Sequence, residues 1–184
     1  MLKKETVMTI IEFGCGNAKT AGAIVIDINP RSQADIIHDL NVFPYPLTDD
    51  SADRIICRDV LEHVENFIKT MEEIWRIAKA DCLIEISGPF MSSVNYFSDP
   101  THKRAFTSRS FDYFVAGTEV HKHSYSYVTF ELIFVSYDPD QLKTRHGISL
   151  WILKLINKNK IRYENKFAFI YPSSQIEFIL KVIK

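Results

Sequence analysis

Two glycines and two acidic residues mark the ends of successive apolar runs near the beginning of the chain. Gly14 and Gly16 follow the run that ends at Phe13. Asp27 ends the second run, and Asp39 follows the third. Glycine has no β-carbon, so its backbone can approach a ligand closely. A carboxylate such as that of Asp27 can accept hydrogen bonds from both hydroxyls of a ribose.

A glycine pair alone is explained equally well by a tight exit from a strand, and a single acid by a turn or a helix cap. Three consecutive strand ends that carry glycine, acid and acid favour a nucleoside pocket, in which Asp39 contacts an adenine edge while Leu40 packs on the ring. The dinucleotide pattern GxGxxG is not met, because Lys19 stands at its third glycine and Asp27 arrives too early for a full crossover helix. Without that helix no full dipole holds a pyrophosphate, and no GKS or GKT follows as in a Walker loop. S-Adenosylmethionine has no phosphate and fits this pattern.

The segments EFGCGNAK, IDIN and HDLNVFPYPLTDDSADRIICRDVLEHV resemble class I S-adenosylmethionine-dependent methyltransferases of the small type 11 group. The chain is most similar to compact members whose first crossover helix is abbreviated, and DPTHKRAFTSRSFDYF resembles the same subgroup. The resemblance covers about residues 8–116 and implies S-adenosyl-L-methionine as the cofactor. It assigns cofactor contacts to Glu12, Gly14, Gly16, Asn17, Asp27, Ile28, Asp39, Leu40, Arg58, Asp59, Val60 and His63.

Methyl transfer from a sulfonium is an in-line displacement, for which the protein must align the acceptor and exclude water. A neutral oxygen or nitrogen acceptor also needs a base, for which the candidates are His63, Asp99, His102 and Asp59. Their alternative roles are structural: His63 bridges loop backbone, and Asp99 only caps a turn. The pair in His121-Lys122-His123 has no partner at ligand spacing, so we expect no metal.

The acceptor class is less defined than the cofactor. We expect a methyltransferase that acts on a small-molecule, sugar or lipid-linked acceptor. The alternative is a cofactor-binding pseudo-methyltransferase or a regulatory subunit without turnover of its own, which has no need of a polar segment such as 88–104. A nucleic-acid acceptor is disfavoured by the net charge of −1.

The elements that must position these residues follow from the apolar patterning. Helix periodicity runs from Leu61 to Ala78, with Glu62 among the charged residues that lie largely on the other faces. Thr107 is a candidate N-cap for a helix that carries Phe111 and Phe114. A short apolar helix is predicted over 149–157. Strands are predicted over 7–13, 23–28, 34–38, 53–58 and 82–87, with β-rich runs over 123–135 and 175–183.

Strands that alternate with crossovers indicate an α/β protein. The resemblance implies a three-layer Rossmann-like methyltransferase fold with a mainly parallel sheet of order 3-2-1-4-5-7-6, an antiparallel last strand and reduced helices after strands 1 and 2. We expect one domain over 1–184, with the cofactor half at about 8–88 and the acceptor and lid part at about 89–184. The thin cover of one sheet face suggests a homodimer or another partner there.

Three cysteines far apart in apolar runs favour reduced thiols and a cytoplasmic protein, and no segment has the pattern of a signal peptide or a membrane span. Ser149 to Lys166 combines Trp151 and leucines with a basic end. It is either a lid helix over the core or a weak contact with an anionic membrane surface.

Overall fold

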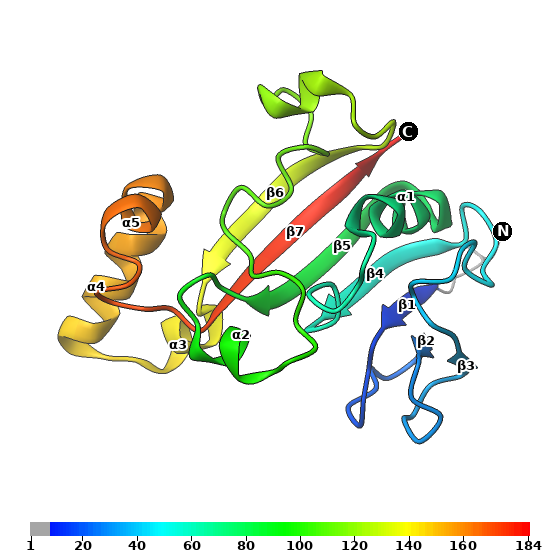
Figure 1. Cartoon of the computed structure of the whole chain (residues 1–184), viewed down its shortest axis with the longest axis horizontal. Helices are drawn as coiled ribbons and strands as arrows, with labels where there is room; N and C mark the ends of the chain where they lie inside the picture. Colours follow the sequence, from blue (N-terminus) through cyan, green and yellow to red (C-terminus); the bar gives the residue numbers. More distant parts are fainter. Residues whose placement is uncertain (1–7) are drawn as a thin grey trace, which may run out of the picture.

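The computed structural model describes residues 8–184 and builds them around one seven-stranded sheet. The order β3-β2-β1-β4-β5-β7-β6 confirms the predicted one. Strands β1 to β5 run parallel, whereas β7 is antiparallel to both β5 and β6 (Figure 1). The strands are β1 (Ile10–Phe13), β2 (Ala23–Asp27), β3 (Ile36–Ile37), β4 (Ala52–Arg58), β5 (Ala78–Pro89), β6 (Thr129–Tyr137) and β7 (Gln175–Ile183). Val7, with which the first predicted strand begins, lies outside the described residues.

Helix α1 (Phe67–Ile77) carries the strongest periodicity of the chain and buries Met71 and Ile74 against the sheet. It begins six residues later than predicted, because the side chain of Asn66 accepts a hydrogen bond from Lys69 N at 3.0 Å and caps it there. Residues 61–63 form a turn before the helix. The prediction that the helix starts at Leu61 is therefore wrong, and so is the placement of Glu62 on an outward helix face.

The region after β5 differs most from the expectation. The predicted helix after Thr107 is a series of turns, in which Ser110 N donates to Thr107 O and Phe114 N to Phe111 O. Its phenylalanines are buried all the same, because they pack on Phe67 and Phe178. Short helices that the sequence did not indicate are α2 (Val94–Ser98), η1 (Val120–His123), α3 (Pro139–Thr144) and α5 (Lys160–Lys166). The predicted apolar helix is α4 (Gly147–Lys158), and the strand expected from residue 123 is β6, which begins at Thr129.

The main core lies on the face of the sheet that α1 and the segment after β5 cover (Figure 1). It includes Phe13, Cys57, Ile86 and Phe178, which stand in register on the four neighbouring strands β1, β4, β5 and β7. No helix lies between residues 10 and 66, so the expectation of reduced helices after the first two strands is confirmed.

The opposite face carries charged and apolar side chains side by side. Arg54 and Glu85 form an ion pair at 2.6 Å, and Lys181 pairs with Glu131 at 2.6 Å. Leu83 is 41 % exposed between them in the same sheet. This face is the one on which a second copy or another partner is expected.

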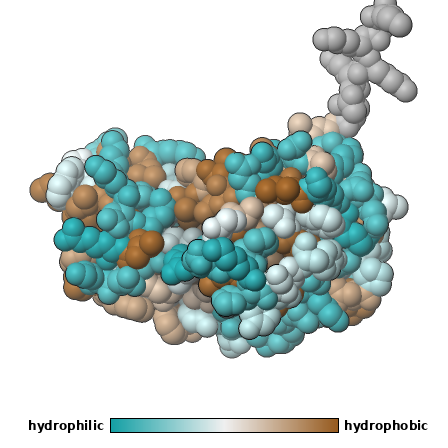
Figure 2. Space-filling model, turned by 90° about the horizontal axis from the view of Figure 1, so that it is seen from above, coloured by the Kyte–Doolittle hydropathy of each residue, from teal (hydrophilic) through white to brown (hydrophobic). Residues whose placement is uncertain are grey.

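Within residues 8–184, no helix is both long and apolar enough to span a membrane. The three cysteines are buried and unpaired. Figure 2 shows hydrophobic and hydrophilic patches interspersed, including at the left end, where Figure 1 places α4 and α5.

Candidate cofactor and acceptor site

The two glycines after β1 differ in what surrounds them. Both adopt the left-handed conformation, with φ of 69° at Gly14 and 50° at Gly16. A β-carbon at position 14 would lie 2.6 Å from Val60 Cγ2, so the absence of a side chain there lets the strand exit pack against the segment after β4. A β-carbon at position 16 would meet nothing within 4 Å. Gly16 therefore borders open space at the carboxyl edge of the sheet.

Glu12 fixes the loop after β1 through hydrogen bonds with Thr20. It is 2 % exposed, and its Oε2 accepts from Thr20 N at 2.7 Å while its Oε1 accepts from Thr20 Oγ1 at 3.0 Å. Arg58 Nη1 donates to the same Oε1 at 3.3 Å and to Thr20 Oγ1 at 3.2 Å. The end of β4 is thereby tied to the loop after β1.

The acids of β2 and β3 stand where the sequence predicts them. Asp27, 8 % exposed, accepts from Gly16 N at 3.0 Å and from Asn29 N at 2.8 Å, one bond to each oxygen. Each carboxylate oxygen has a further lone pair, so room remains for hydroxyl donors. Ile28 beside it is 62 % exposed, as a side chain that flanks a bound ring would be. The open space at Gly16, the acid at Asp27 and the exposed Ile28 fit a nucleoside.

Asp39 and Leu40 are already partly engaged by other residues of the chain, which limits their contact with a ligand. Asp39 Oδ1 accepts from Asn41 N and from Asn41 Nδ2, both at 2.9 Å. Leu40 is 8 % exposed and belongs to the main core. Only the other Asp39 oxygen and the edge of Leu40 are available to an adenine ring.

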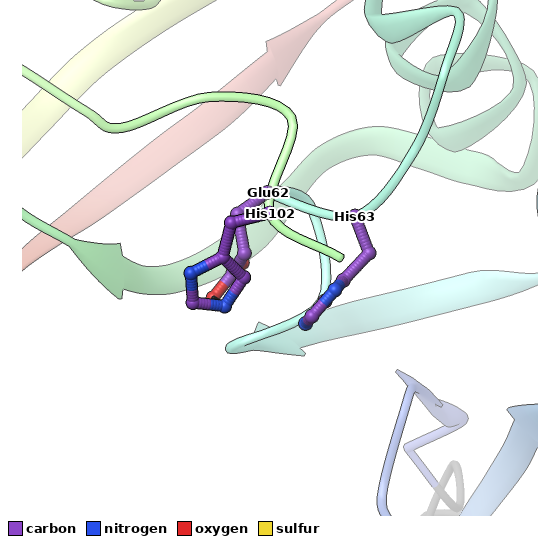
Figure 3. Close-up of side chains that lie close together, drawn as sticks. All are labelled: Glu62, His63 and His102. Atoms are coloured by element: carbon purple, nitrogen blue, oxygen red, sulfur yellow. Dashed lines mark ion pairs between the residues drawn. The ribbon is translucent and has the colours of Figure 1, made fainter. Parts of the chain in front are cut away.

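A second group of side chains meets beyond β4 and α2. Glu62 and His63 come from the turn after β4, and His102 comes from the loop after α2. The rings of His63 and His102 have centroids 4.7 Å apart, and His102 Nε2 lies 3.9 Å from Glu62 Oε1. Figure 3 shows Glu62 and His102 side by side, with His63 next to them.

Arg104 joins the two segments that carry this cluster. Its Nη1 donates to Leu61 O at 2.8 Å and to Val64 O at 2.6 Å, and its Nη2 donates to Glu65 O at 3.3 Å. The guanidinium also lies over the Phe67 ring, 5.0 Å from its centroid. One side chain thus satisfies three carbonyl groups of the turn and fixes it against the loop that carries His102.

Both histidines have a second hydrogen-bond partner. His63 Nδ1 is 2.8 Å from Thr101 Oγ1, which in turn donates to Asp99 Oδ1 at 2.6 Å. His102 Nδ1 is 3.1 Å from the carbonyl oxygen of Tyr96. Asp99 therefore reaches His63 only through the hydroxyl of Thr101. The structure brings the predicted candidates His63, Asp99 and His102 together.

Burial dominates the electrostatics of the cluster. Glu62 is 1 % exposed, and burial raises the pKa of its carboxyl to about 8. Burial, followed by the proximity of His102, lowers the pKa of His63. The hydrogen bonds from Thr101 lower the pKa of Asp99. Glu62 Oε2 is buried and has no hydrogen-bond partner.

A cavity of about 300 Å³ opens beside the cluster. It lies at the carboxyl ends of β4 and β5 and reaches from Asp59 to the loop before α3. Gln175 Nε2 donates to Asp59 Oδ1 at 3.1 Å at its rim. Its lining is polar and acidic, and includes Asp59, Glu62, Asn95, His102, Asp138 and Asp140.

The sequence pointed to the histidines but not to Glu62, Thr101, Arg104 or the acids near α3. For Glu62 the only signal was its position next to His63 in LEHV. The remaining predicted contact residues lie at the surface: Asn17 is exposed in the turn after the glycine loop, and Asp59 is exposed with φ of 48°. Val60 is buried against Gly14.

Part of the chain that carries this geometry matches a known family model. Residues 11–86 match the family model described as "Methyltransferase domain". This segment contains the glycine loop, both acids and the turn that carries Glu62 and His63. The matched domain and the strand order support the expectation of a class I S-adenosylmethionine-dependent methyltransferase. They also support S-adenosyl-L-methionine as the cofactor.

Solved structures support the methyltransferase fold over nearly the whole chain. A SAM-dependent methyltransferase from Archaeoglobus fulgidus is 17 % identical, with a TM-score of 0.58 over 95 % of this chain and 86 % of that one. The YcgJ protein of Bacillus subtilis is 14 % identical, with a TM-score of 0.58 over 96 % and 92 %.

A third methyltransferase structure contains the cofactor. Phosphoethanolamine N-methyltransferase 2 of Haemonchus contortus, in complex with S-adenosyl-L-methionine, is 16 % identical, with a TM-score of 0.57 over 97 % of this chain and 49 % of that one. At such identities the likeness establishes the fold and not the acceptor. None of the curated proteins matches the sequence of this chain.

Proposed function

We propose that the chain is an active methyltransferase that transfers a methyl group to a small-molecule, sugar or lipid-linked acceptor bound in the 300 Å³ cavity. The position of this cavity supports the proposal, because it adjoins Asp59 on the cofactor side and the Glu62 and His102 side chains on the other. When bound, the cofactor supplies an electrophilic methyl group. The chain itself must orient the acceptor and take up or release its proton.

The cofactor-binding residues are proposed by position. Asp27 would accept from the ribose hydroxyls, Ile28 and Leu40 would flank the adenine, and Asp39 would contact its edge. Gly14, Gly16 and Asn17 would border the methionine part together with Arg58, Asp59 and Val60. Glu12 supports this set through Thr20 and the glycine loop.

The lining of the cavity narrows the acceptor class. Four carboxyl groups line it, from Asp59, Glu62, Asp138 and Asp140, and no lysine or arginine is among the lining residues. Such a wall repels phosphate and carboxylate groups and suits hydroxyl or amine groups, which donate hydrogen bonds to carboxylates. We therefore propose a hydroxyl or amine acceptor, with its reacting atom next to His102.

The three predicted catalytic candidates take different parts in this proposal. His102 lines the cavity and would contact the acceptor. His63 would contact the acceptor or the methyl donor from the neighbouring position. Asp99 would orient His63 through Thr101, and its Oδ2 also lies 3.9 Å from His102 Nε2. A binding protein without turnover has no need of this arrangement, which favours the enzyme over the pseudo-methyltransferase or regulatory subunit.

The C-terminal helices support a lipid-linked acceptor within this class. Leu153 and Ile156 of α4 are buried, whereas Ile148, Trp151 and Leu155 are 79 %, 64 % and 51 % exposed. The helix therefore covers the core with one face and presents an apolar stripe with the other. Exposed basic side chains flank the stripe at Lys154, Lys158, Arg162 and Lys166. An anionic membrane surface matches both features.

Calorimetric titration with S-adenosylmethionine tests the cofactor, and release of S-adenosylhomocysteine tests turnover. We expect cofactor binding in the micromolar range. In a screen of matched alcohol, amine, carboxylate and phosphate acceptors, we expect turnover only with alcohols or amines. Binding without turnover in any class would favour the regulatory subunit, and no binding would overturn the proposal.

A further inference from the structure

Three side chains with metal-binding atoms converge beside the cavity. One ligand atom from each of Glu62, His63 and His102 lies within 4.8 Å of the other two (Figure 3). Glu62 and His102 also line the 300 Å³ cavity, so the group borders space that a small molecule can enter. The three residues come from two segments that Arg104 holds together.

The hydrogen bonds of the cluster define which histidine nitrogens are free. The Tyr96 carbonyl near His102 Nδ1 can only accept, so Nδ1 carries the proton and Nε2 keeps its lone pair. The hydroxyl of Thr101 donates its hydrogen bond to the carboxylate of Asp99. Thr101 Oγ1 therefore accepts a hydrogen bond from His63 Nδ1–H. His63 Nε2 is left with its lone pair as well. Two imidazoles held by Nδ1 with Nε2 free are the arrangement found around protein-bound metal ions.

Glu62 supplies the independent observation that a ligand is needed. Its side chain is 1 % exposed, and its Oε2 has no hydrogen-bond partner. The nearest guanidinium, of Arg104, is engaged by backbone carbonyl groups instead. Buried polar atoms are nearly always paired in folded proteins, and an unpaired carboxylate oxygen is costly. A cation that the carboxylate binds through both oxygens would satisfy Oε2 and would also lie beside Oε1, the oxygen that faces His102.

We propose that Glu62, His63 and His102 form a three-ligand site for a divalent transition-metal ion of the zinc, cobalt or manganese type, with the remaining positions open to the cavity. Two imidazoles and one carboxylate make up a donor set used by such ions in open sites, whereas magnesium and calcium prefer oxygen alone. His102 Nε2 and Glu62 Oε1 are 3.9 Å apart. Ligands about 2.0–2.1 Å from a tetrahedral ion are about 3.3 Å apart, so the three ligand atoms, which lie within 4.8 Å of one another, must move closer together when the ion binds.

The role of the ion rests on the proposed function. An acceptor hydroxyl or amine at an open position would be oriented next to the methyl donor, and a hydroxyl there would lose its proton more readily. The sequence favoured no metal, because its only closely spaced histidines are His121 and His123. The ligands of the proposed site are separated in the chain by the whole of α1 and β5.

The test uses the full chain without an affinity tag, stripped with a chelator and titrated with Co²⁺. We expect one Co²⁺ per chain, with visible absorption bands typical of nitrogen and oxygen ligation, and displacement by Zn²⁺. His102→Ala should weaken binding at least about 100-fold, and Glu62→Gln at least about 10-fold. The matched control is the double variant His121→Ala/His123→Ala, which should bind as the parent does. Circular dichroism confirms that each variant is folded.

No bound Co²⁺ in the folded parent chain would overturn the metal site, as would loss of binding in the His121 and His123 control alone. The outcome is separable from that of the proposed function. Cofactor binding and turnover in a chelator-stripped chain that binds no Co²⁺ would retain the methyltransferase and reject the metal site. Metal binding without any cofactor binding would retain the metal site and reject the methyltransferase.

Discussion

Gly14 lies so close to Val60 that a β-carbon at position 14 would come within 2.6 Å of Val60 Cγ2 and 2.8 Å of its Cβ. Gly16, two residues on, has the same left-handed backbone but open space where its β-carbon would be. A side chain at position 14 would therefore disturb packing, whereas one at position 16 would enter the open space that we propose for the ligand.

Gly16→Ala should cost about 1–2 kcal/mol of the free energy of unfolding, the cost of placing a side chain at positive φ. Gly14→Ala should cost more, because the clash with Val60 adds to the same backbone term. Chemical denaturation measures both. A double-mutant cycle with Val60→Ala should show coupling for Gly14 and none for Gly16. Equal losses for the two alanine variants would contradict this account.

Asp27→Ala should weaken S-adenosylmethionine binding by roughly 1–3 kcal/mol, because buried ribose hydroxyls lose their acceptor. Isothermal titration checks this. Asp27 also accepts from Gly16 N and Asn29 N, so part of the loss could arise in the loop. Asp27→Asn keeps one oxygen and should bind more tightly than the alanine variant. Parent-like affinity in Asp27→Ala would show that the ribose is bound elsewhere.

Arg104→Lys should lower the free energy of unfolding by about 2–3 kcal/mol, because a single ammonium nitrogen cannot replace the planar guanidinium, whose two Nη atoms reach three carbonyl groups and which lies over the Phe67 ring. Arg109→Lys is the matched control. That arginine pairs with Asp112 at the surface and should change stability by less than about 1 kcal/mol. Thermal and denaturant unfolding measure the stability of both variants. Similar losses at the two positions would show that the carbonyl contacts of Arg104 do not stabilise the turn.

The parent chain should co-sediment with anionic vesicles at low salt and less at high salt, with each basic side chain contributing about 1 kcal/mol at most. Trp151→Ala/Leu155→Ala should reduce this binding, because both side chains belong to the exposed stripe of α4. Tyr125→Ala, at a 66 % exposed aromatic elsewhere, should not. If the parent does not bind anionic vesicles at low salt, α4 serves only to cover the core.

The sheet, and the position of the glycines and acids at its carboxyl edge, could be predicted because their signals are local. Apolar runs ended by Gly14, Asp27 and Arg58 mark strand ends directly, and the missing helix after β1 follows from how early Asp27 arrives. The order of the strands needed the family resemblance, since nothing in the runs themselves says which strand lies beside which.

The acceptor side depends on contacts between distant segments, which leave no periodic trace. Glu62 looked like an outward helix residue because the spacing of Leu61 and Val64 continues that of α1. Asn66 breaks the helix, and the turn before it brings Glu62 inward. Phe111 and Phe114 were correctly expected in the core, but the side chains of other segments hold them there without a helix.

The placement of β7 also governs how the molecule can be assembled. In the sheet, β6 has β7 as its only neighbour, and β7 separates it from β5. During synthesis, therefore, β6 is made well before the strand that joins it to the rest, and β5 presents a bare edge for the same interval. Open strand edges invite pairing with other chains. The nascent protein is consequently exposed to such pairing between the making of residue 137 and that of residue 183, and a chain that ends in this interval would leave unpaired the edges of β5 and β6 that β7 covers.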